Sequence, residues 1–163
     1  MFTMRRFIAP VVCVALSASL ASAAESTLTA DLAVHKVKPV DATVVLRSIA
    51  NVERAVAVDD DTIRVWGDAS RIAIARTVVD LIEKPADASE TSVQLADGTT
   101  AAIAALRHAS AIDVLRALRA KLGIRKVATI DADNSSSSIL VRDSSERAQE
   151  ALKLIAEMDG EGS

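Results

Sequence analysis

The most constraining feature of this chain is an internal repeat. Residues 34–85 recur as residues 103–159 with apolar, basic and small residues in nearly the same places. The first stretch of the repeat matches Val34, Val37, Lys38, Ala42, Val45, Leu46, Arg47 and Ile49 with Ile103, Leu106, Arg107, Ala111, Val114, Leu115, Arg116 and Leu118. After a hairpin that is longer in the second copy, Ile63, Val65, Arg71, Ala75, Val78, Val79 and Ile82 match Ile139, Val141, Arg147, Ala151, Leu154, Ile155 and Met158. A duplicated small unit predicts a modular architecture rather than one catalytic cleft.

The first 23 residues predict a cleaved secretory signal peptide. Arg5 and Arg6 precede an apolar run at residues 7–20, which is too short to cross a bilayer comfortably as a helix. Residues 21–23 then supply the small side chains that a signal peptidase accepts. The alternative is an uncleaved anchor. The only cysteine, Cys13, would leave with the signal, so we expect a disulfide-free mature chain in the bacterial periplasm, without stable membrane insertion.

The mature chain is expected to form two small domains. Removing the signal leaves 140 residues, and the repeat favours unit 1 at residues 31–86, a linker at 87–91 and unit 2 at 92–159. Without Arg5 and Arg6, 17 basic residues face 22 acidic ones, for a net charge of −5. Trp66 is the sole aromatic residue that remains. This acidic balance and the lack of stacking side chains argue against nucleic acid as a partner.

Changes of hydrophobic period predict the elements of unit 1. Residues 33–38 alternate as a strand does, Pro39 and Val40 break the pattern, and Asp41 is placed to cap a helix over residues 42–49. Residues 55–58 and 62–66 read as a hairpin around an acidic turn. A second helix follows, capped by Asp68 or Ser70 and closed by Pro85. The predicted order is β-α-β-β-α.

Unit 2 repeats this order and adds one strand. The pattern predicts a strand over residues 102–107, a helix over 111–122 between Ser110 and Gly123, a hairpin of residues 126–130 and 139–142, and a helix from Ser144 or Ser145 to Met158. Residues 92–95 alternate ahead of a tight Asp97-Gly98 turn, so they are expected to pair with the first strand of the unit. The predicted fold class is α+β, with two tandem β-α-β-β-α sandwich units, each with two helices on a small sheet.

The second copy resembles the short N-terminal repeat domain of bacterial secretins. The resemblance rests on three stretches: Leu106-Arg107-His108-Ala109-Ser110-Ala111, then Asp133-Asn134-Ser135-Ser136-Ser137-Ser138-Ile139-Leu140-Val141, then Ala151 through Leu154-Ile155 to Met158-Asp159. Ser137 stands where that family usually has Asn. The first copy is similar, with a shorter hairpin. The long β-rich pore region of a secretin is missing, since a barrel needs many strands of about ten alternating residues.

This resemblance implies a free-standing periplasmic module, like nodulation-associated secretin N-domain proteins. In the family such domains pack side by side into rings and contact other secretion components. It therefore implies a non-enzymatic interaction protein whose partners are a secretin, another secretion-system component or further copies of itself. No cofactor is implied.

Catalytic and metal-binding interpretations find less support. His35 and His108 have no cysteine to join them, and metal sites need three or four ligands at fixed spacing. Asp131, Asp133 and Asn134 fail the calcium-loop pattern, while Ser135–Ser138 lack a nearby base and read as a flexible hairpin tip. A periplasmic ligand- or metal-binding accessory protein remains the alternative. It predicts that the histidines or acidic turns bind zinc or calcium in a calorimetric titration.

Four residues are the candidates for partner contact. Trp66 ends a hairpin strand, where it could be a core residue or an exposed anchor, and tryptophan is enriched in binding hot spots. Arg71, Arg116 and Arg147 fall on predicted exposed helix faces. Lys121, Arg125 and Lys126 surround a single Gly123, which is too few glycines for a nucleic-acid clamp, and fit cations that offset a helix dipole.

Overall fold

A computed structural model describes residues 27–84, 90–132 and 136–160. The expected signal peptide at 1–23 and most of the expected linker lie outside these ranges, as do Asp133, Asn134 and Ser135. Along the described chain, the elements are β1 (Leu28–Ala33), α1 (Pro39–Val45), the π-helical turn η1 (Leu46–Ala50), β2 (Arg54–Ala57), β3 (Thr62–Gly67), α2 (Ala69–Ile82), β4 (Glu90–Gln94), β5 (Thr100–Leu106), α3 (Ala111–Leu122), β6 (Val127–Ala132), β7 (Ser136–Asp143) and α4 (Ser145–Gly160).

The elements form two antiparallel sheets with the same connectivity. Sheet A has the strand order β1-β3-β2, and sheet B has the order β4-β5-β7-β6. Strands β5, β7 and β6 thus correspond to β1, β3 and β2, and β4 is the additional edge strand expected before the second copy. The α+β class and the β-α-β-β-α order of each unit are confirmed.

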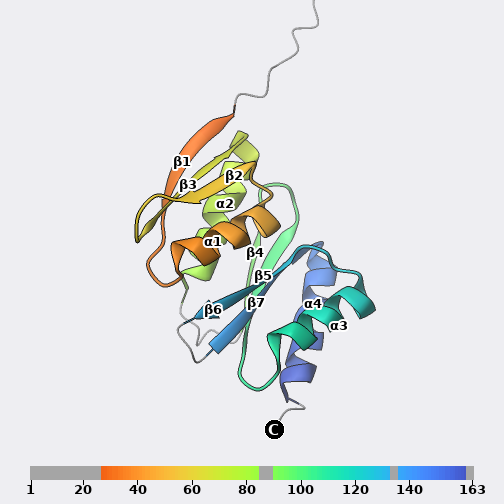
Figure 1. Ribbon diagram of the computed structural model, residues 1–163. Helices are drawn as coiled ribbons and strands as arrows, with labels where there is room; N and C mark the ends of the chain where they lie inside the picture. Colours follow the sequence, from red (N-terminus) through yellow and green to blue (C-terminus); the bar gives the residue numbers. More distant parts are fainter. Residues whose placement is uncertain (1–26, 85–89, 133–135, 161–163) are drawn as a thin grey trace, which may run out of the picture.

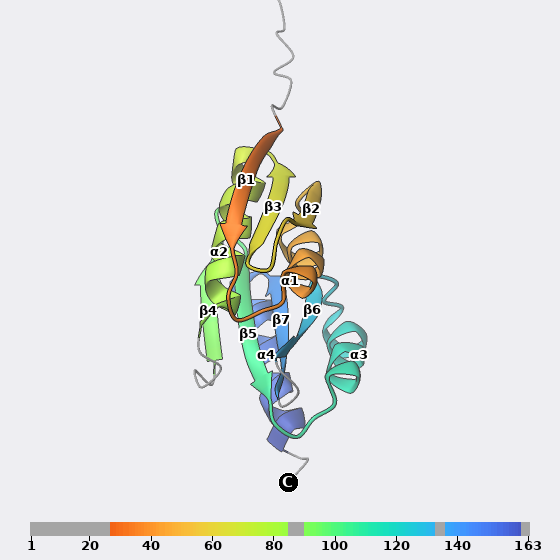
Figure 2. The same cartoon turned by 60° about the vertical axis from the view of Figure 1, so that its left-hand side comes forward.

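The layers alternate between sheet and helix along the molecule (Figure 1). Helices α1 and α2, with η1, pack on one face of sheet A and also contact strands of sheet B. Helices α3 and α4 cover the opposite face of sheet B. Figure 2 shows unit 1 above unit 2, with the strands of sheet B between the two helix layers. The helices of unit 1 therefore cover two sheets, which the repeat alone did not predict.

The hydrophobic core follows these layers. One buried cluster contains the apolar residues of unit 1 together with Leu95 from the β4–β5 turn and Ala101, Ala128, Ile130 and Leu140 from sheet B. A second cluster lies between sheet B and helices α3 and α4, around Val114, Leu118 and Ile155. Alternate residues of β7 enter different clusters, since Leu140 belongs to the first while Ile139 and Val141 belong to the second. Sheet B is thus buried on both faces, which joins the two units through one shared core.

The first strand is not where the period predicted it. The prediction of a strand at residues 33–38 is wrong, because β1 ends at Ala33 and residues 34–38 form the connection to α1. Val34 and Val37 are buried there, which produced the apolar alternation. Ile63 pairs with Leu32, and Ile139, which matches Ile63 in the repeat, pairs with Ala104. Leu32 therefore corresponds to Ala104 in the structure, whereas the repeat matched Val34 with Ile103, which is a shift of three residues.

The first helix begins earlier than expected. Pro39 occupies the first turn of α1 instead of breaking the chain, because an N–H there has no partner within the helix. Asp41 therefore lies in the first turn and is not the cap, which is Lys38. The helix ends in the π-helical turn η1, after which Asn51 adopts a left-handed conformation with φ of 56°.

The other elements lie close to their predicted ranges. Asp68 caps α2 by accepting a hydrogen bond from the backbone N–H of Arg71 at 2.8 Å, and Gly123 ends α3 with φ of 62°. Gly98 has φ of 80° in the tight turn between β4 and β5. The prediction of a flexible tip at Ser135–Ser138 is wrong for Ser136, Ser137 and Ser138, which belong to β7 because they pair with β6 and β5.

Candidate protein-interaction site

The same carboxylate contact closes each unit. Glu83, at the end of α2, accepts hydrogen bonds from the backbone N–H groups of His35 at 3.0 Å and Lys36 at 3.1 Å. Asp159, near the end of α4, accepts from Arg107 at 2.9 Å, His108 at 2.8 Å and Ala109 at 2.9 Å. Both carboxylates thus anchor the connection between the first strand and first helix of their unit.

The same contact lowers the pKa of Asp159. Burial by itself would raise the pKa of Asp159, but the N–H donors of Ala109, His108 and Arg107 outweigh burial and hold the pKa below its usual value. The carboxylate therefore remains an acceptor at neutral pH. Glu83 and Asp159 follow Ile82 and Met158, which the repeat already matched, so extending the repeat by one residue would have found this pair.

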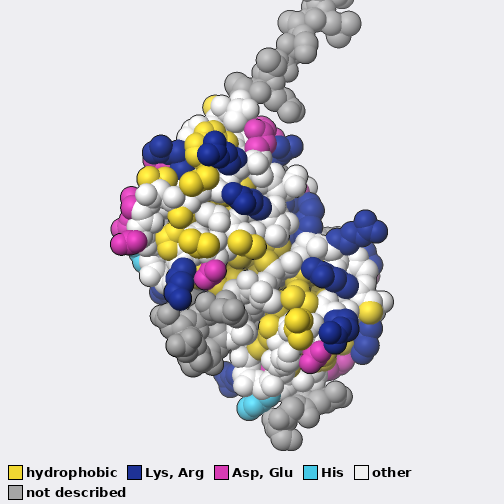
Figure 3. Space-filling model, in the orientation of Figure 1, with side chains coloured by type: hydrophobic (Ala, Val, Ile, Leu, Met, Phe, Trp, Pro, Cys, Tyr) yellow, Lys and Arg dark blue, Asp and Glu magenta, His cyan; other side chains and the backbone are white. Residues whose placement is uncertain are grey.

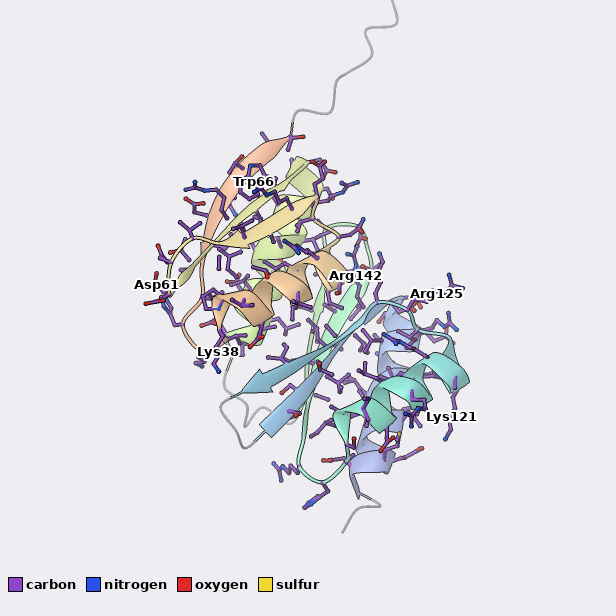
Figure 4. The ribbon with its side chains drawn as sticks, viewed as in Figure 1. Lys38, Asp61, Trp66, Lys121, Arg125 and Arg142 are labelled. Atoms are coloured by element: carbon purple, nitrogen blue, oxygen red, sulfur yellow. The ribbon has the colours of Figure 1, made fainter. Side chains whose placement is uncertain are left out.

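Arg142 joins the two units, a role that a single charge after an apolar run does not predict. Its side chain is 4% exposed. The guanidinium donates to the carboxylate of Asp97, to the Thr99 hydroxyl at 2.9 Å and to the backbone carbonyl of Ile49 in η1. Figure 4 shows Arg142 where η1 of unit 1 meets sheet B. This one side chain therefore ties the β4–β5 turn to the end of the first helical segment.

Acid is expected to weaken this junction. Burial opposes ionisation of Asp97, but the hydroxyl and N–H of Thr99 and the guanidinium of Arg142 lower its pKa from 3.8 to about 2. A pKa that is lower in the folded state stabilises the protein above pH 4, and this contribution is lost as the pH falls toward 2. Because the Asp97 side chain is 33% exposed, screening reduces the loss to about 1–2 kcal/mol.

Urea unfolding at pH 6 and pH 2.5 measures this effect. Asp97→Asn provides the control, because it removes the titrating group. The variant should therefore lose less stability between the two pH values than the unmodified chain, and an equal loss in both would contradict the assignment to Asp97.

Trp66 lies on the uncovered face of sheet A. It alternates along β3 with Ile63 and Val65, which are buried against the helices, so its ring points to the opposite side. The guanidinium carbon of Arg54 lies 4.8 Å from the ring centroid, within the range of a cation–π contact. The sequence left open whether Trp66 is a core residue, and the structure places it half-buried on the outer face (Figure 4).

The other three candidates are distributed over both units. Arg71 bonds to Glu53 at 3.4 Å and to Asp68 at 3.1 Å, close to Trp66, whose carbonyl accepts from the N–H of Glu53. In unit 2, Arg116 pairs with Asp113 at 2.9 Å on exposed α3, and Arg147 donates to the carbonyl of Leu122 at the end of α3. Trp66 and Arg71 thus share one region, and Arg116 and Arg147 lie in another. Their contact with a partner stays a prediction.

The two histidines do not form a common site. His35 and His108 are exposed, and each lies in the strand–helix connection of a different unit. Within residues 27–84, 90–132 and 136–160, no three His, Cys, Asp or Glu side chains gather as a metal ion would require. Among the helices that the structure describes, none is sufficiently long and apolar to span a membrane.

Comparison with known families finds a match in the C-terminal part of the chain. Residues 103–163 match the bacterial type II/III secretion system short domain. The described part of this secretin N-domain runs from β5 through α3, β6 and β7 to α4, the same stretch whose residues resembled secretins in sequence. Strand β4 and all of unit 1 lie outside the match. No curated protein and no solved structure matches the chain.

The matched region contains part of the site described above. Asp159 and the N–H groups it binds lie within it, as do Arg142, Arg116 and Arg147. Asp97 and Ile49, the acceptors that link Arg142 to the rest of the chain, lie before its start. The secretin N-domain is therefore built into a larger packed structure through its own buried arginine.

Proposed function

We propose that this protein is a non-enzymatic periplasmic interaction module that binds a component of a bacterial secretion apparatus, such as a secretin. The observation that carries the proposal is the match of residues 103–163 to the secretion system short domain. Domains of this family are periplasmic in general, and the basic and apolar N-terminal residues fit the export signal that the sequence predicts.

We further propose that unit 1 is a second, diverged copy of the same domain. The shared element order supports this, as does the carboxylate of Glu83, which holds its connection as Asp159 holds that of unit 2. Two such units in tandem provide a rigid periplasmic spacer, with the outer face of sheet A at one end and helices α3 and α4 at the other (Figure 1).

Crosslinking in the bacterial envelope tests the proposal. The tagged full-length protein is crosslinked in cells and purified from the envelope, and the attached proteins are identified. We expect a secretin or another secretion-system component among them. A protein that stays monomeric at high concentration and recovers no secretion or outer-membrane component would show that the proposal is wrong.

Trp66→Ala in a parallel sample tests the anchor role of this residue. Truncating a hot-spot tryptophan costs at least about 2 kcal/mol of binding, so recovery of the partner should fall more than tenfold if Trp66 is such an anchor. Val58→Ala is the matched control, because Val58 is also an exposed apolar residue of unit 1. Equal recovery with both variants would remove Trp66 from the interface.

A further inference from the structure

Strand β6 has a free edge. In the described part of the chain, sheet B ends at β6, whose only neighbour is β7. The N–H of Arg142 donates to the carbonyl of Lys126 at 2.9 Å, so Lys126 and Arg142 form a hydrogen-bonded pair of the β6–β7 ladder. Because hydrogen-bonded pairs alternate in an antiparallel ladder, the backbone groups of Ala128 face β7, while those of Val127 and Thr129 point outward. The outward groups are in position to pair with another strand.

Exposed apolar side chains lie on the two helices that pack against β6. Helix α1 packs against one face of β6 and helix α3 against the other. On α1, Val40 is 66% exposed and Val44 is 56% exposed, on successive turns. On α3, Ile112 is 64% exposed, and half-buried Leu115 follows on the next turn. Figure 3 shows apolar side chains gathered between α1 and α3 on this face. We call these four residues and the outer edge of β6 the β6 surface.

Cations surround the β6 surface. Arg116 and Arg119 lie on α3 beside Ile112 and Leu115, where these residues line a shallow pocket of about 520 Å³. Lys126 precedes β6 and Lys38 caps α1, and both are exposed. The same face of the molecule shows more Lys and Arg than Asp and Glu (Figure 3). Asp41 on α1 and Asp113 on α3, which pairs with Arg116 at 2.9 Å, offset two of these four positive charges, so the local balance stays positive although the chain as a whole is acidic.

This charge decides between two kinds of occupant. A second copy paired through its own β6 would bring two sets of cations together, and like charges across a strand pair are destabilising. A segment with carboxylate side chains would meet the arginines and lysines with opposite charge. Its apolar side chains, alternating to the two faces of the sheet, would reach α1 on one side and α3 on the other.

We propose that the free edge of β6 accepts an extended segment of a partner protein, containing apolar and acidic residues, as an added strand. In this mode the backbone hydrogen bonds provide affinity and the flanking side chains provide selectivity. The inference rests on the proposed function and names the surface through which it would act. The opposite edge of sheet B is less suited, because β4 exposes polar Ser92 and Gln94.

Binding of synthetic peptides to the full chain tests this assignment without the natural partner. One ten-residue peptide has four consecutive valines between two blocks of three glutamates, so that valines face both α1 and α3, and a second has lysines in place of the glutamates. NMR titration should show binding of the glutamate peptide, with slower amide exchange at Val127 and Thr129. The lysine peptide should bind at least tenfold more weakly. Absence of binding, or slower exchange at β4 in place of β6, would overturn the proposal.

Two matched proline variants isolate the backbone contact. Thr129→Pro removes an outward N–H and leaves the ladder to β7 complete, which edge strands tolerate. The N–H of Leu95 bonds to the carbonyl of Thr99, so the N–H of Gln94 also points outward, and Gln94→Pro makes the same change at the opposite edge. We expect Thr129→Pro to weaken binding more than tenfold and Gln94→Pro to leave it unchanged. Equal effects of the two would contradict strand addition at β6.

A charge reversal keeps the test independent of the proline variants. The double variant Arg116→Glu with Arg119→Glu changes only exposed residues of α3. It should bind the lysine peptide in preference to the glutamate peptide. An unchanged preference would show that the arginines of α3 do not select acidic segments. If peptides bind as expected but no secretion component is crosslinked in cells, the surface assignment stands and the proposed pathway is wrong. The reverse outcome retains the pathway and rejects the surface.

Discussion

Replacing Arg142 with methionine is expected to lower the free energy of unfolding by about 2–4 kcal/mol. Methionine has a similar length and fits an apolar site, so the loss comes from the groups that Arg142 now bonds. The carbonyl of buried Ile49 would lose its donor, and the carboxylate of Asp97 would lose its ion pair. Asp97 is one-third exposed and regains some water, which keeps the loss below that of a fully buried pair.

Urea unfolding followed by circular dichroism measures this loss. Arg147→Met is the matched control, since Arg147 is exposed and donates to one carbonyl at the end of α3. We expect the control to change stability by about 1 kcal/mol or less. Similar losses of stability for the two variants would show that burial of Arg142 between the units does not increase its contribution to the free energy of unfolding.

Replacing Leu140 with alanine is expected to cost about 2–5 kcal/mol and to destabilise both units together. Leu140 lies on β7 of unit 2, is fully buried and belongs to the cluster that contains the core of unit 1. The substitution leaves a cavity between sheet B and the helices of unit 1. Because the two units share this core, neither one should unfold alone.

Fluorescence of Trp66 provides the measurement. Trp66 is the only tryptophan of the chain and lies in sheet A, so its signal reports on unit 1. In Leu140→Ala the fluorescence transition should move to lower urea together with the circular dichroism transition. Leu118→Ala, in the separate cluster under α3, tests whether the whole chain unfolds as one unit. A Trp66 transition that stays in place in Leu140→Ala would show that the units are independent.

Short-range patterns account for most of the correct predictions. The caps at Asp68 and Gly123, the turn at Asp97-Gly98 and the apolar stripe of α2 each depend on residues a few positions apart. The wrong predictions fall where tertiary contacts override the local spacing of apolar residues. Residues 33–38 are predicted as a strand, yet the backbone between Val34 and Val37 bonds to Glu83, which lies far along the chain.

The residues of the candidate site were likewise only partly predictable from the sequence. The sequence named Trp66 as an unusual residue because it is the only aromatic left after the signal, but alternation within β3 was needed to place it on the outer face. Arg142 could not be found from its neighbours, since its three acceptors come from a distant turn and from another unit. The β6 surface likewise combines α1 and α3, which are separated by most of the folded chain.

By itself the sequence determined the repeated β-α-β-β-α unit, its secretin-like second copy and the near absence of aromatic residues, because period, caps and composition are local properties. Only the tertiary structure decided that the helices of unit 1 cover both sheets, that Arg142 joins the units and that, in the described part of the chain, β6 is an edge strand of sheet B. The physical reason is that burial of sheet B on both faces depends on how the units pack against each other. The spacing of apolar residues within one unit shows only that a face is apolar, and does not show what covers that face.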